Sequence, residues 1–563
     1  MRRYLPLVLA IVLTLGCSDE PRQEGNDAGL NQTDPDADPN HTEPDADPNH
    51  TEPDADPNHT EPTPGDWRLP EDYFVPAKME MTLVHPRNHE ASSWAYARNA
   101  HPGVTWEIPV VVQGGAWPFQ YEIVDDGGAD GLVIGGELHR REDGDYLIHE
   151  VTDDYGVLRW DDPVEGAYEI LLRVNDQDEN SLDVPISLTV GTEGWIFVDP
   201  ATGDDGNDGS IDAPFATVGR IHDGDGAPFG GYRVYLVGEV LLDGNRENGN
   251  LRIDEGDAPA VWVGFPGSDA VLEAFEGKFV LDSPDFYLAN LEHRHHEDFF
   301  QDDDTFLHMI TVWQNTHRYT VHDVTFSRFQ GVPVNTGLGN SSLMMFTNPD
   351  VPRNHVAVVN NTMTGTSGFM TSAYFLHHAV FEKNRAVDAH FTTGEASVWA
   401  IIYIKGGDNQ HVTLRANRFV GDNQWDLGSG ALGILQARNV EVAYNTVETP
   451  WDSGRRGTLV MWTNSSQSSY TWTEDTPVWV YRNSLRRRLH WEGDNLANMP
   501  DGNVHIERNL LEGGAWPESP LITADDNHGE GTYFDVTMSL TDDARPDHLG
   551  RRGAEIAVPL DEM

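Results

Sequence analysis

Val358-Val-Asn-Asn-Thr-Met363 is the first of six stretches with one pattern: an apolar residue, two variable residues, asparagine, one variable residue and an apolar residue. The other five are centred on Asn384, Asn417, Asn445, Asn483 and Asn509, and Leu291 and Val324 occupy the equivalent place earlier in the chain. From Asn361 onward the asparagines are 23, 33, 28, 38 and 26 residues apart. A constant motif at varied spacing indicates stacked turns joined by loops of different length. An inward-facing amide can donate to one neighbouring turn and accept from the other, so we expect the asparagines to align.

Residues 197–217 read Phe197-Val-Asp-Pro-Ala-Thr-Gly-Asp-Asp-Gly-Asn-Asp-Gly-Ser-Ile-Asp-Ala-Pro-Phe-Ala-Thr217, an apolar strand, a Gly/Asp-rich loop and a Pro-Phe-x-Thr segment. This stretch resembles the opening of right-handed parallel β-helix proteins of the pectate-lyase-like superfamily. The resemblance implies a short capping helix after Thr217, which would cover unpaired backbone groups at the end of the stack. We expect an all-β protein with a right-handed parallel β-helix solenoid over residues 192–545 and a C-terminal tail over 546–563.

Four short alternating runs precede this segment, at residues 105–112, 119–124, 168–174 and 182–190. Alternation with a period of two predicts strands with one buried face, and we expect a β-sandwich over residues 67–191. Residues 166–176 (GAYEILLRVND) resemble the late strands of bacterial immunoglobulin-like and cadherin-like modules. The resemblance implies a spacer or binding module with Asn175, Asp176 and Asp178 as calcium ligands. An acidic hairpin turn is the alternative.

The first 17 residues have the features of an export signal: Arg2 and Arg3, an apolar run and Gly16-Cys17. Cys17 resembles the lipidated cysteine of bacterial lipoproteins, although Thr14 stands where that family usually has leucine. The resemblance implies a secreted protein that is lipid-anchored to a bacterial membrane, at the outer membrane or cell surface. A plain cleavable signal is the alternative. Residues 18–66 contain a nine-residue acidic repeat without large apolar residues, which predicts a disordered linker.

The composition excludes several classes of partner and site. A formal net charge of -57 leaves no basic surface for nucleic acid, so we expect no nucleic-acid partner. The same charge would repel a polyanionic sugar unless a cation intervenes. One cysteine rules out intramolecular disulfides and thiolate metal clusters. We expect a monomer whose partners are a polysaccharide and, through the anchor, a membrane.

Pairs of a large apolar and a following polar residue recur before the asparagine positions. The predicted core-facing members are Trp313, Phe346, Leu376, Ile404, Leu435 and Trp462. The predicted outward-facing polar members are Gln314, Thr347, His377, Lys405, Gln436 and Thr463. Two residues before each polar member stand Val312, Met345, Phe375, Tyr403, Ile434 and Met461, which we expect on the same outer face. Such a face would be a sugar platform, with Tyr403, Gln436, Gln314 and Thr463 in contact with substrate; a face covered by a long loop is the alternative.

Residues 401–419 (IIYIKGGDNQHVTLRANRF) contain an isolated lysine, Lys405. They resemble the turn of β-helix polysaccharide lyases that carries a catalytic lysine. The resemblance implies that Lys405 removes the C5 proton of a uronic acid, assisted by His377 and Arg418, with calcium or a cationic side chain stabilising the intermediate. Gln436 stands where those enzymes usually have Arg or His. A structural lysine before a Gly-Gly turn is the alternative.

Two polar clusters are candidate metal sites. Asp204, Asp205, Asn207 and Asp208 offer oxygen ligands for Ca²⁺, with an acidic turn as the alternative. His293, His295 and His296 are predicted to lie in a solvated loop, with zinc binding as the alternative. The sequence thus favours a surface protein that acts on or binds polysaccharide, by β-elimination of uronate-containing glycans. A non-catalytic glycan-binding adhesin is the alternative function.

Overall fold

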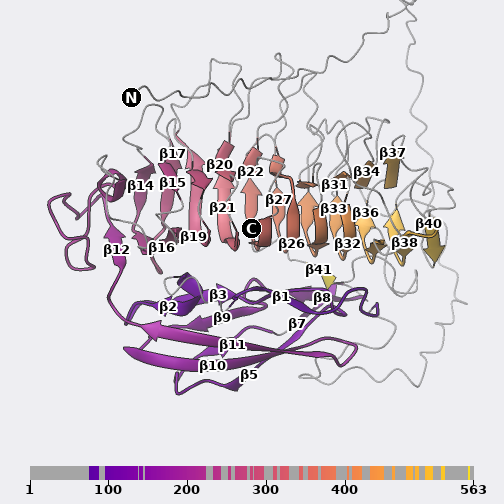
Figure 1. Cartoon of the computed structure of the whole chain (residues 1–563), viewed down its shortest axis with the longest axis horizontal. Helices are drawn as coiled ribbons and strands as arrows, with labels where there is room; N and C mark the ends of the chain where they lie inside the picture. The colour runs from indigo at the N-terminus through magenta and orange to yellow at the C-terminus, as the bar shows by residue number, and fades with distance from the viewer. Residues whose placement is uncertain are drawn as a thin grey trace, which may run out of the picture. The chain divides into compact units, whose positions relative to one another are not determined.

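The computed structural model describes an all-β chain (Figure 1). In the part of the chain that it describes, the helices are two short 3-10 turns, η1 (Tyr96–Arg98) and η2 (Val218–His222), and none could cross a membrane. The described residues are 75–87, 95–136, 138–143, 146–222, 233–242, 251–254, 260–274, 279–282, 284–296, 308–312, 317–328, 342–346, 353–364, 369–387, 402–404, 409–420, 432–435, 437–448, 459–462, 477–485, 489–492, 501–511, 522–525 and 556–557.

Residues 75–190 form small, mainly antiparallel sheets, here called the antiparallel region. Its largest sheet has the order β2 (Asn99–Ala100), β11 (Ser181–Val190), β10 (Gly166–Asn175) and β5 (Gln120–Asp125). The others contain β3 (Trp106–Pro109), β9 (Val157–Trp160) and β6 (Val133–Ile134); β1 (Thr82–His85) and β4 (Val111–Gln113); and β7 (Leu138–Asp143), β8 (Tyr146–Val151) and β41 (Ile556–Ala557). The four alternating runs of the sequence all contain strands, as predicted. Their buried residues surround Trp106 and Trp117, so period-two alternation builds this core.

Residues 195–525 form two long parallel sheets, here called the parallel-sheet region (Figure 1). The 20-stranded sheet contains β12 (Trp195–Val198), β13 (Arg233–Leu236), β14 (Glu239–Leu242), β16 (Ala260–Gly264), β17 (Val271–Ala274), β19 (Phe286–His295), β21 (Tyr319–Ser327), β23 (Arg353–Val359), β24 (Thr362–Thr364), β26 (Leu376–Glu382), β27 (Arg385–Val387), β29 (Asn409–Arg415), β30 (Arg418–Val420), β32 (Ala437–Ala443), β33 (Thr446–Glu448), β35 (Val478–Tyr481), β36 (Ser484–Leu485), β38 (Val504–Glu507), β39 (Leu510–Leu511) and β40 (Ile522–Asp525). The nine-stranded sheet contains β15 (Leu251–Asp254), β18 (Phe279–Asp282), β20 (His308–Val312), β22 (Ser342–Phe346), β25 (Phe369–Ala373), β28 (Ile402–Ile404), β31 (Leu432–Leu435), β34 (Leu459–Trp462) and β37 (Leu489–Glu492).

From β25 to β39, each turn of the chain contributes one strand to the nine-stranded sheet and then two to the 20-stranded sheet. Each strand pairs in parallel with its counterpart in the next turn, as β28 does with β31 and β29 with β32. This arrangement is compatible with a parallel β-helix. Where the sequence predicts a short capping helix, the chain forms the 3-10 turn η2, whose Val218 and Ile221 are buried in the core.

The six motif asparagines are fully buried and stand one above another, as predicted. The Nδ2 of Asn384 donates to the Oδ1 of Asn417 over 2.9 Å, and the Nδ2 of Asn417 donates to the Oδ1 of Asn445 over 2.9 Å. The ladder continues through Asn483 to Asn509. Each Oδ1 also accepts the backbone N–H of the residue at the preceding ladder position, as Asn417 does from Asn384 over 3.1 Å and Asn361 does from Val324 over 3.0 Å. The amides therefore satisfy backbone groups of the bend between two consecutive strands of one turn, such as β26 and β27.

Replacing Asn417 with alanine is expected to destabilise the fold by about 3 kcal/mol, because buried donors of Asn384 and the carbonyl of Phe381 lose their partners. Urea denaturation of the full chain measures the change. Gln410→Ala, in the neighbouring strand β29 but half-buried, is the matched control and should cost about 0.5 kcal/mol or less. Equal losses in the two variants would contradict the structural role of the ladder.

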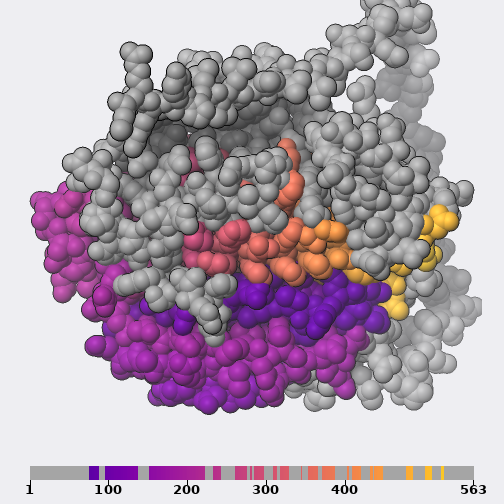
Figure 2. Space-filling view, in the orientation of Figure 1, coloured from indigo at the N-terminus to yellow at the C-terminus, as the bar shows by residue number. Residues whose placement is uncertain are grey.

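The antiparallel region packs against one face of the 20-stranded sheet (Figure 2). Val84 and Val111 form an apolar cluster with Ala357, Val359 and Val380. Gln113 lies close by, and its Nε2 donates to the carbonyl of His411 over 2.5 Å. These contacts form a buried interface between the two regions, here called the seam. Both regions contribute residues to it.

Candidate functional site

Most of the predicted polysaccharide face lies outside the described residues. Lys405, Gln436, Gln314 and Thr463 fall there, as does the lipidation candidate Cys17. Tyr403 is described: it lies in β28, is 6% exposed and belongs to the same apolar cluster as Ile402 and Ile404. Its burial matches the alternative in which this face is covered.

The predicted alignment of that face is partly wrong. Val312, rather than Trp313, pairs with Phe346, and Ile434, rather than Leu435, pairs with Ile404. Val312 and Ile434 are therefore core residues instead of outward-facing ones. A slip of one residue exchanges the two faces of a strand, and loops of varied length remove the spacing that would fix the alignment.

His377 and Arg418 lie in different places on the 20-stranded sheet. His377 is the second residue of β26 and lies beside Gln410, whose Nε2 donates to His377 Nε2 over 2.7 Å. The prediction put Leu376 in the same core row as Ile404, with His377 directly after it. In the nine-stranded sheet, however, Ala373 is the residue that pairs with Ile404. Arg418 lies beyond the asparagine turn, level with Arg385 and Thr446. The described residues thus do not bring the two side chains into one row.

The acidic loop at residues 204–208 uses its oxygens on its own backbone. Asp204 accepts from the N–H of Gly206, Asp208 from Ser210, and Asp205 from Ala216 and Thr217. Asn207 donates its Nδ2 to the carbonyl of Pro214 over 2.9 Å. Within the described residues, no three His, Cys, Asp or Glu side chains are grouped as metal ligands. Calcium binding by Asp204, Asp205, Asn207 and Asp208 stays a prediction.

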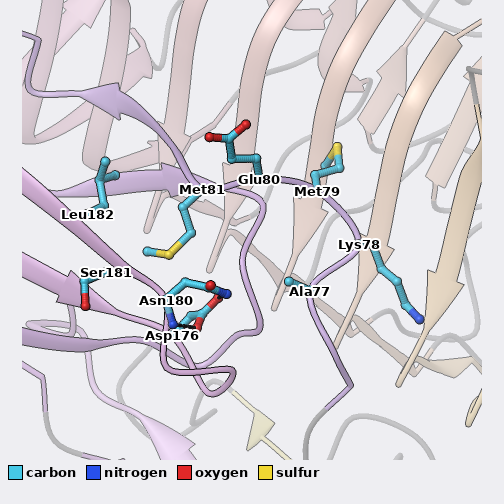
Figure 3. A pocket seen from close by; sticks show the side chains of 9 residues that line it. All are labelled: Ala77, Lys78, Met79, Glu80, Met81, Asp176, Asn180, Ser181 and Leu182. Atoms are coloured by element: carbon cyan, nitrogen blue, oxygen red, sulfur yellow. Dashed lines mark hydrogen bonds between the residues drawn. The ribbon is translucent and has the colours of Figure 1, made fainter.

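The hairpin between β10 and β11 lines a cavity of about 520 Å³ with residues 77–81 (Figure 3). Asp176 is fully buried there, and its carboxylate accepts from the N–H groups of Ala116 and Asn180 and from Asn180 Nδ2. Asp178 accepts from the N–H of Ala77 over 2.8 Å. Figure 3 shows Lys78 extending away from Asp176, toward its ion pair with Glu507 at 2.5 Å. These contacts are those of the acidic hairpin turn, the alternative to a calcium site.

His293 and His295 correct a further prediction. They lie in β19, 0% and 4% exposed, rather than in a solvated loop. Desolvation by burial lowers the pKa of His293 to about 4, so its ring is neutral near neutral pH.

A row of left-handed residues marks the seam. The residue before each ladder position has a positive φ, as in Asn290 (57°), Asp323 (52°), Asn360 (57°) and Lys383 (55°). Asn and Asp adopt this conformation more readily than most residues, which favours them in the row. Several side chains of the row contact the antiparallel region: Asn290 Nδ2 donates to Glu107 Oε1 over 2.6 Å, and Lys383 Nζ donates to the carbonyl of Tyr155 over 2.7 Å.

Two cavities open along this row. The larger, about 570 Å³, is lined by Glu107, Arg159, Asn290, Asp323 and the segment 264–271, among others. The smaller, about 210 Å³, is lined by Val133, Asp153, His322 and Asn360, among others. Glu107, Arg159 and Asp323 line both, so two carboxyl groups from different regions stand where the cavities meet.

The two carboxyl groups have different surroundings. Desolvation raises the pKa of Glu107, while the Arg159 guanidinium at 3.3 Å and the Asn290 amide oppose the rise by favouring the charged form. The Asp323 side chain is exposed on one side, while desolvation by the surrounding protein and the nearby Glu107 and Asp153 charges raise its pKa to about 6. Among the described residues, none donates a hydrogen bond to the Asp323 side chain. Unequal environments of this kind separate an acid from a base.

The raised pKa of Asp323 predicts a pH-dependent cost. Between its ordinary value near 3.8 and about 6, the folded protein holds a proton that the unfolded chain releases, so this group destabilises the fold as pH rises through that window. Asp323→Asn should therefore raise the melting temperature at pH 8 more than at pH 4. Thermal unfolding at both pH values measures the difference. An equal shift at the two values would contradict the assigned desolvation.

Neither Glu107 nor Asp323 is predicted from the sequence. Asp323 directly precedes Val324, which the repeat places at a ladder position, so its left-handed, outward-facing role could have been inferred from the motif. Glu107 carries no such signal, because its contacts depend on how two regions far apart in the chain pack together.

Comparison with known protein families finds no match, and comparison with curated proteins finds none either. Among solved structures, the native GH136 lacto-N-biosidase from Eubacterium ramulus is similar over 59% of this chain and 67% of that one, at 14% identity and a TM-score of 0.23. A likeness of this extent carries no argument about activity.

Proposed function

We propose that this chain is a lipid-anchored surface protein that hydrolyses glycosidic bonds in neutral glycans. Its parallel-sheet region is a right-handed parallel β-helix of the pectate-lyase-like kind, and its antiparallel region is an immunoglobulin- or cadherin-like module. Cys17 carries the anchor, and residues 18–66 hold the protein away from the membrane. The observation that supports hydrolysis is the pair Glu107 and Asp323 at the junction of two cavities.

The pair suits acid–base cleavage of an acetal. Asp323, protonated near its pKa of about 6, donates its proton to the glycosidic oxygen as the bond to the anomeric carbon breaks. In its carboxylate form, which Arg159 and Asn290 favour, Glu107 takes a proton from the attacking water or itself attacks the anomeric carbon. Water supplies the hydroxyl that the anomeric carbon gains and releases one proton. After direct attack that proton passes from Glu107 to Asp323 through solvent, and when water breaks a glycosyl–Glu107 bond it passes to Asp323 directly.

The charge of the larger cavity favours neutral sugars. Glu107, Asp323, Glu292 and Asp269 line it, against the single cation Arg159 among the described lining residues. A uronate carboxylate would meet this excess of negative charge and be repelled, whereas sugar hydroxyls can both donate and accept. Hydrolysis of neutral glycans therefore fits this cavity better than β-elimination of uronates.

A panel of neutral and acidic polysaccharides tests the proposal. We expect the full chain to release reducing ends from a neutral glycan, and Glu107→Gln to lose this activity. Asp183→Asn, which removes an exposed carboxylate paired with Arg173, is the control and should keep it. Absorbance of unsaturated uronates that disappears in Lys405→Ala would instead establish β-elimination. Binding to a glycan without either product would establish an adhesin.

A further inference from the structure

The two cavities differ in size and share the carboxyl groups, which bears on where a glycan is cut. We infer that the smaller cavity is a subsite for one terminal sugar ring, so that the protein removes single neutral sugars from the end of a chain. The inference rests on the proposed function for the cleavage step, but not for the binding of the sugar. A volume of about 210 Å³ leaves room for one ring, while the larger cavity, about 570 Å³, would hold the rest of the glycan.

The lining of the smaller cavity matches the two kinds of surface on a pyranose. Val133 and Val157 come from the antiparallel region and offer apolar contact to the C–H face of a ring. His322 and Asn360 come from the parallel-sheet region and offer polar atoms to hydroxyl groups. Apolar walls with a few convergent polar groups are typical of small-molecule sites.

His322 is the second observation that indicates a ligand. Its side chain is 2% exposed, and among the described residues neither ring nitrogen has a hydrogen-bond partner. Desolvation by burial lowers its pKa to about 3, so the ring is neutral, with one donor and one acceptor. Buried polar atoms without partners are costly, and a sugar hydroxyl beside the ring would satisfy one of the two nitrogens.

Hydrogen bonds fix Asn360 and Asp153, two of the residues that line this cavity. Arg385 NH1 donates to Asn360 Oδ1 over 3.1 Å, and its NH2 bonds the Asp153 carboxylate. Lys383 Nζ donates to the carbonyl of Asp153 over 3.1 Å. At Gly135, an added Cβ would lie 2.0 Å from the carbonyl oxygen of Asp154, so the wall is tight there. The tight wall and the volume of about 210 Å³ are the grounds for limiting the subsite to one terminal ring.

Calorimetry with free monosaccharides tests the subsite without any cleavage. The probes are glucose, galactose, mannose and N-acetylglucosamine, with glucuronate as the anionic comparison. We expect the full chain to bind at least one neutral sugar and His322→Phe to bind it at least tenfold more weakly. Val133→Trp, which fills the cavity from an exposed position, should do the same if His322→Phe folds poorly. His505→Phe, outside both cavities, should bind as the unchanged protein does.

Failure to bind every neutral sugar, or equal binding by both cavity variants and the control, would overturn the inference. The products from end-labelled neutral oligosaccharides give the second test. Single sugars at early times support end removal, whereas internal fragments would leave hydrolysis intact and overturn the terminal subsite. Monosaccharide binding that both cavity variants weaken, without any cleavage, would keep the subsite and reject hydrolysis.

Discussion

Asp323→Asn is expected to lower the rate of glycan hydrolysis by a factor of about 10² to 10⁴, the usual contribution of a positioned proton donor. An asparagine cannot donate the proton that the departing oxygen needs. The substitution should not disturb the backbone, because Asn290 and Asn360 occupy the same left-handed row with φ of 57°. Initial rates of reducing-end release measure the loss.

A substrate that needs no proton distinguishes this role from a structural one. With an aryl glycoside whose phenolate leaves unaided, Asp323→Asn should lose far less of its rate than with a natural glycan. In the unchanged protein, the rate on natural glycans should fall as pH rises above about 6, because Asp323 then loses its proton. Equal losses on both substrates, or a rate that stays constant from pH 6 to 9, would contradict the assignment.

The stack of turns could be predicted because its signal is local and repeats. Each asparagine is set between two apolar residues, and the amide bonds its counterparts in the turns above and below, as Asn384 and Asn417 do. The motif therefore encodes a contact between residues 33 apart without needing to specify the loop between them. The alternating runs that form β10 and β11 are readable for a similar reason, since period-two burial is a property of the strand itself.

The residues that pair between successive strands of the nine-stranded sheet could not be predicted, because no residue type recurs at a fixed position in these strands. Val312 and Trp313 are adjacent and both apolar, so either fits a core place beside Phe346 by composition alone. His293 shows the same limit from the polar side: the residues around it are charged, yet its own face of β19 is buried. Polarity averaged over a segment does not reveal which face a strand turns inward.

The candidate site depends on packing that no local pattern records. Glu107 and Asp323 come from different regions, and both line the two cavities only because β3 and β21 face the same seam. The raised pKa of Asp323 is likewise a property of that packing, as it arises from desolvation and from the charges of Glu107 and Asp153. The sequence could identify the row position of Asp323, but not its partner.

The same seam contains an ion pair whose disruption should have the largest effect on stability. Arg415 Nε donates to Glu382 Oε2 over 3.0 Å, and Arg415 NH2 donates to the carbonyl of Val112 over 2.7 Å. The two side chains are 0% and 7% exposed, and the guanidinium lies 4.8 Å from the centre of the Phe119 ring. Arg415 thus joins the parallel-sheet region to the antiparallel region through buried contacts.

Glu382→Ala should cost about 3–5 kcal/mol of unfolding free energy, because it leaves the Arg415 charge buried without this partner. Urea denaturation of the full chain measures the loss. Asp183→Ala, which breaks the exposed pair with Arg173, is the control and should change stability little. The double variant Glu382→Leu, Arg415→Met should recover much of the loss, since it removes both charges and refills the space. A double variant as unstable as Glu382→Ala would show that Arg415 stabilises the seam through Val112 and Phe119 rather than through its charge partner.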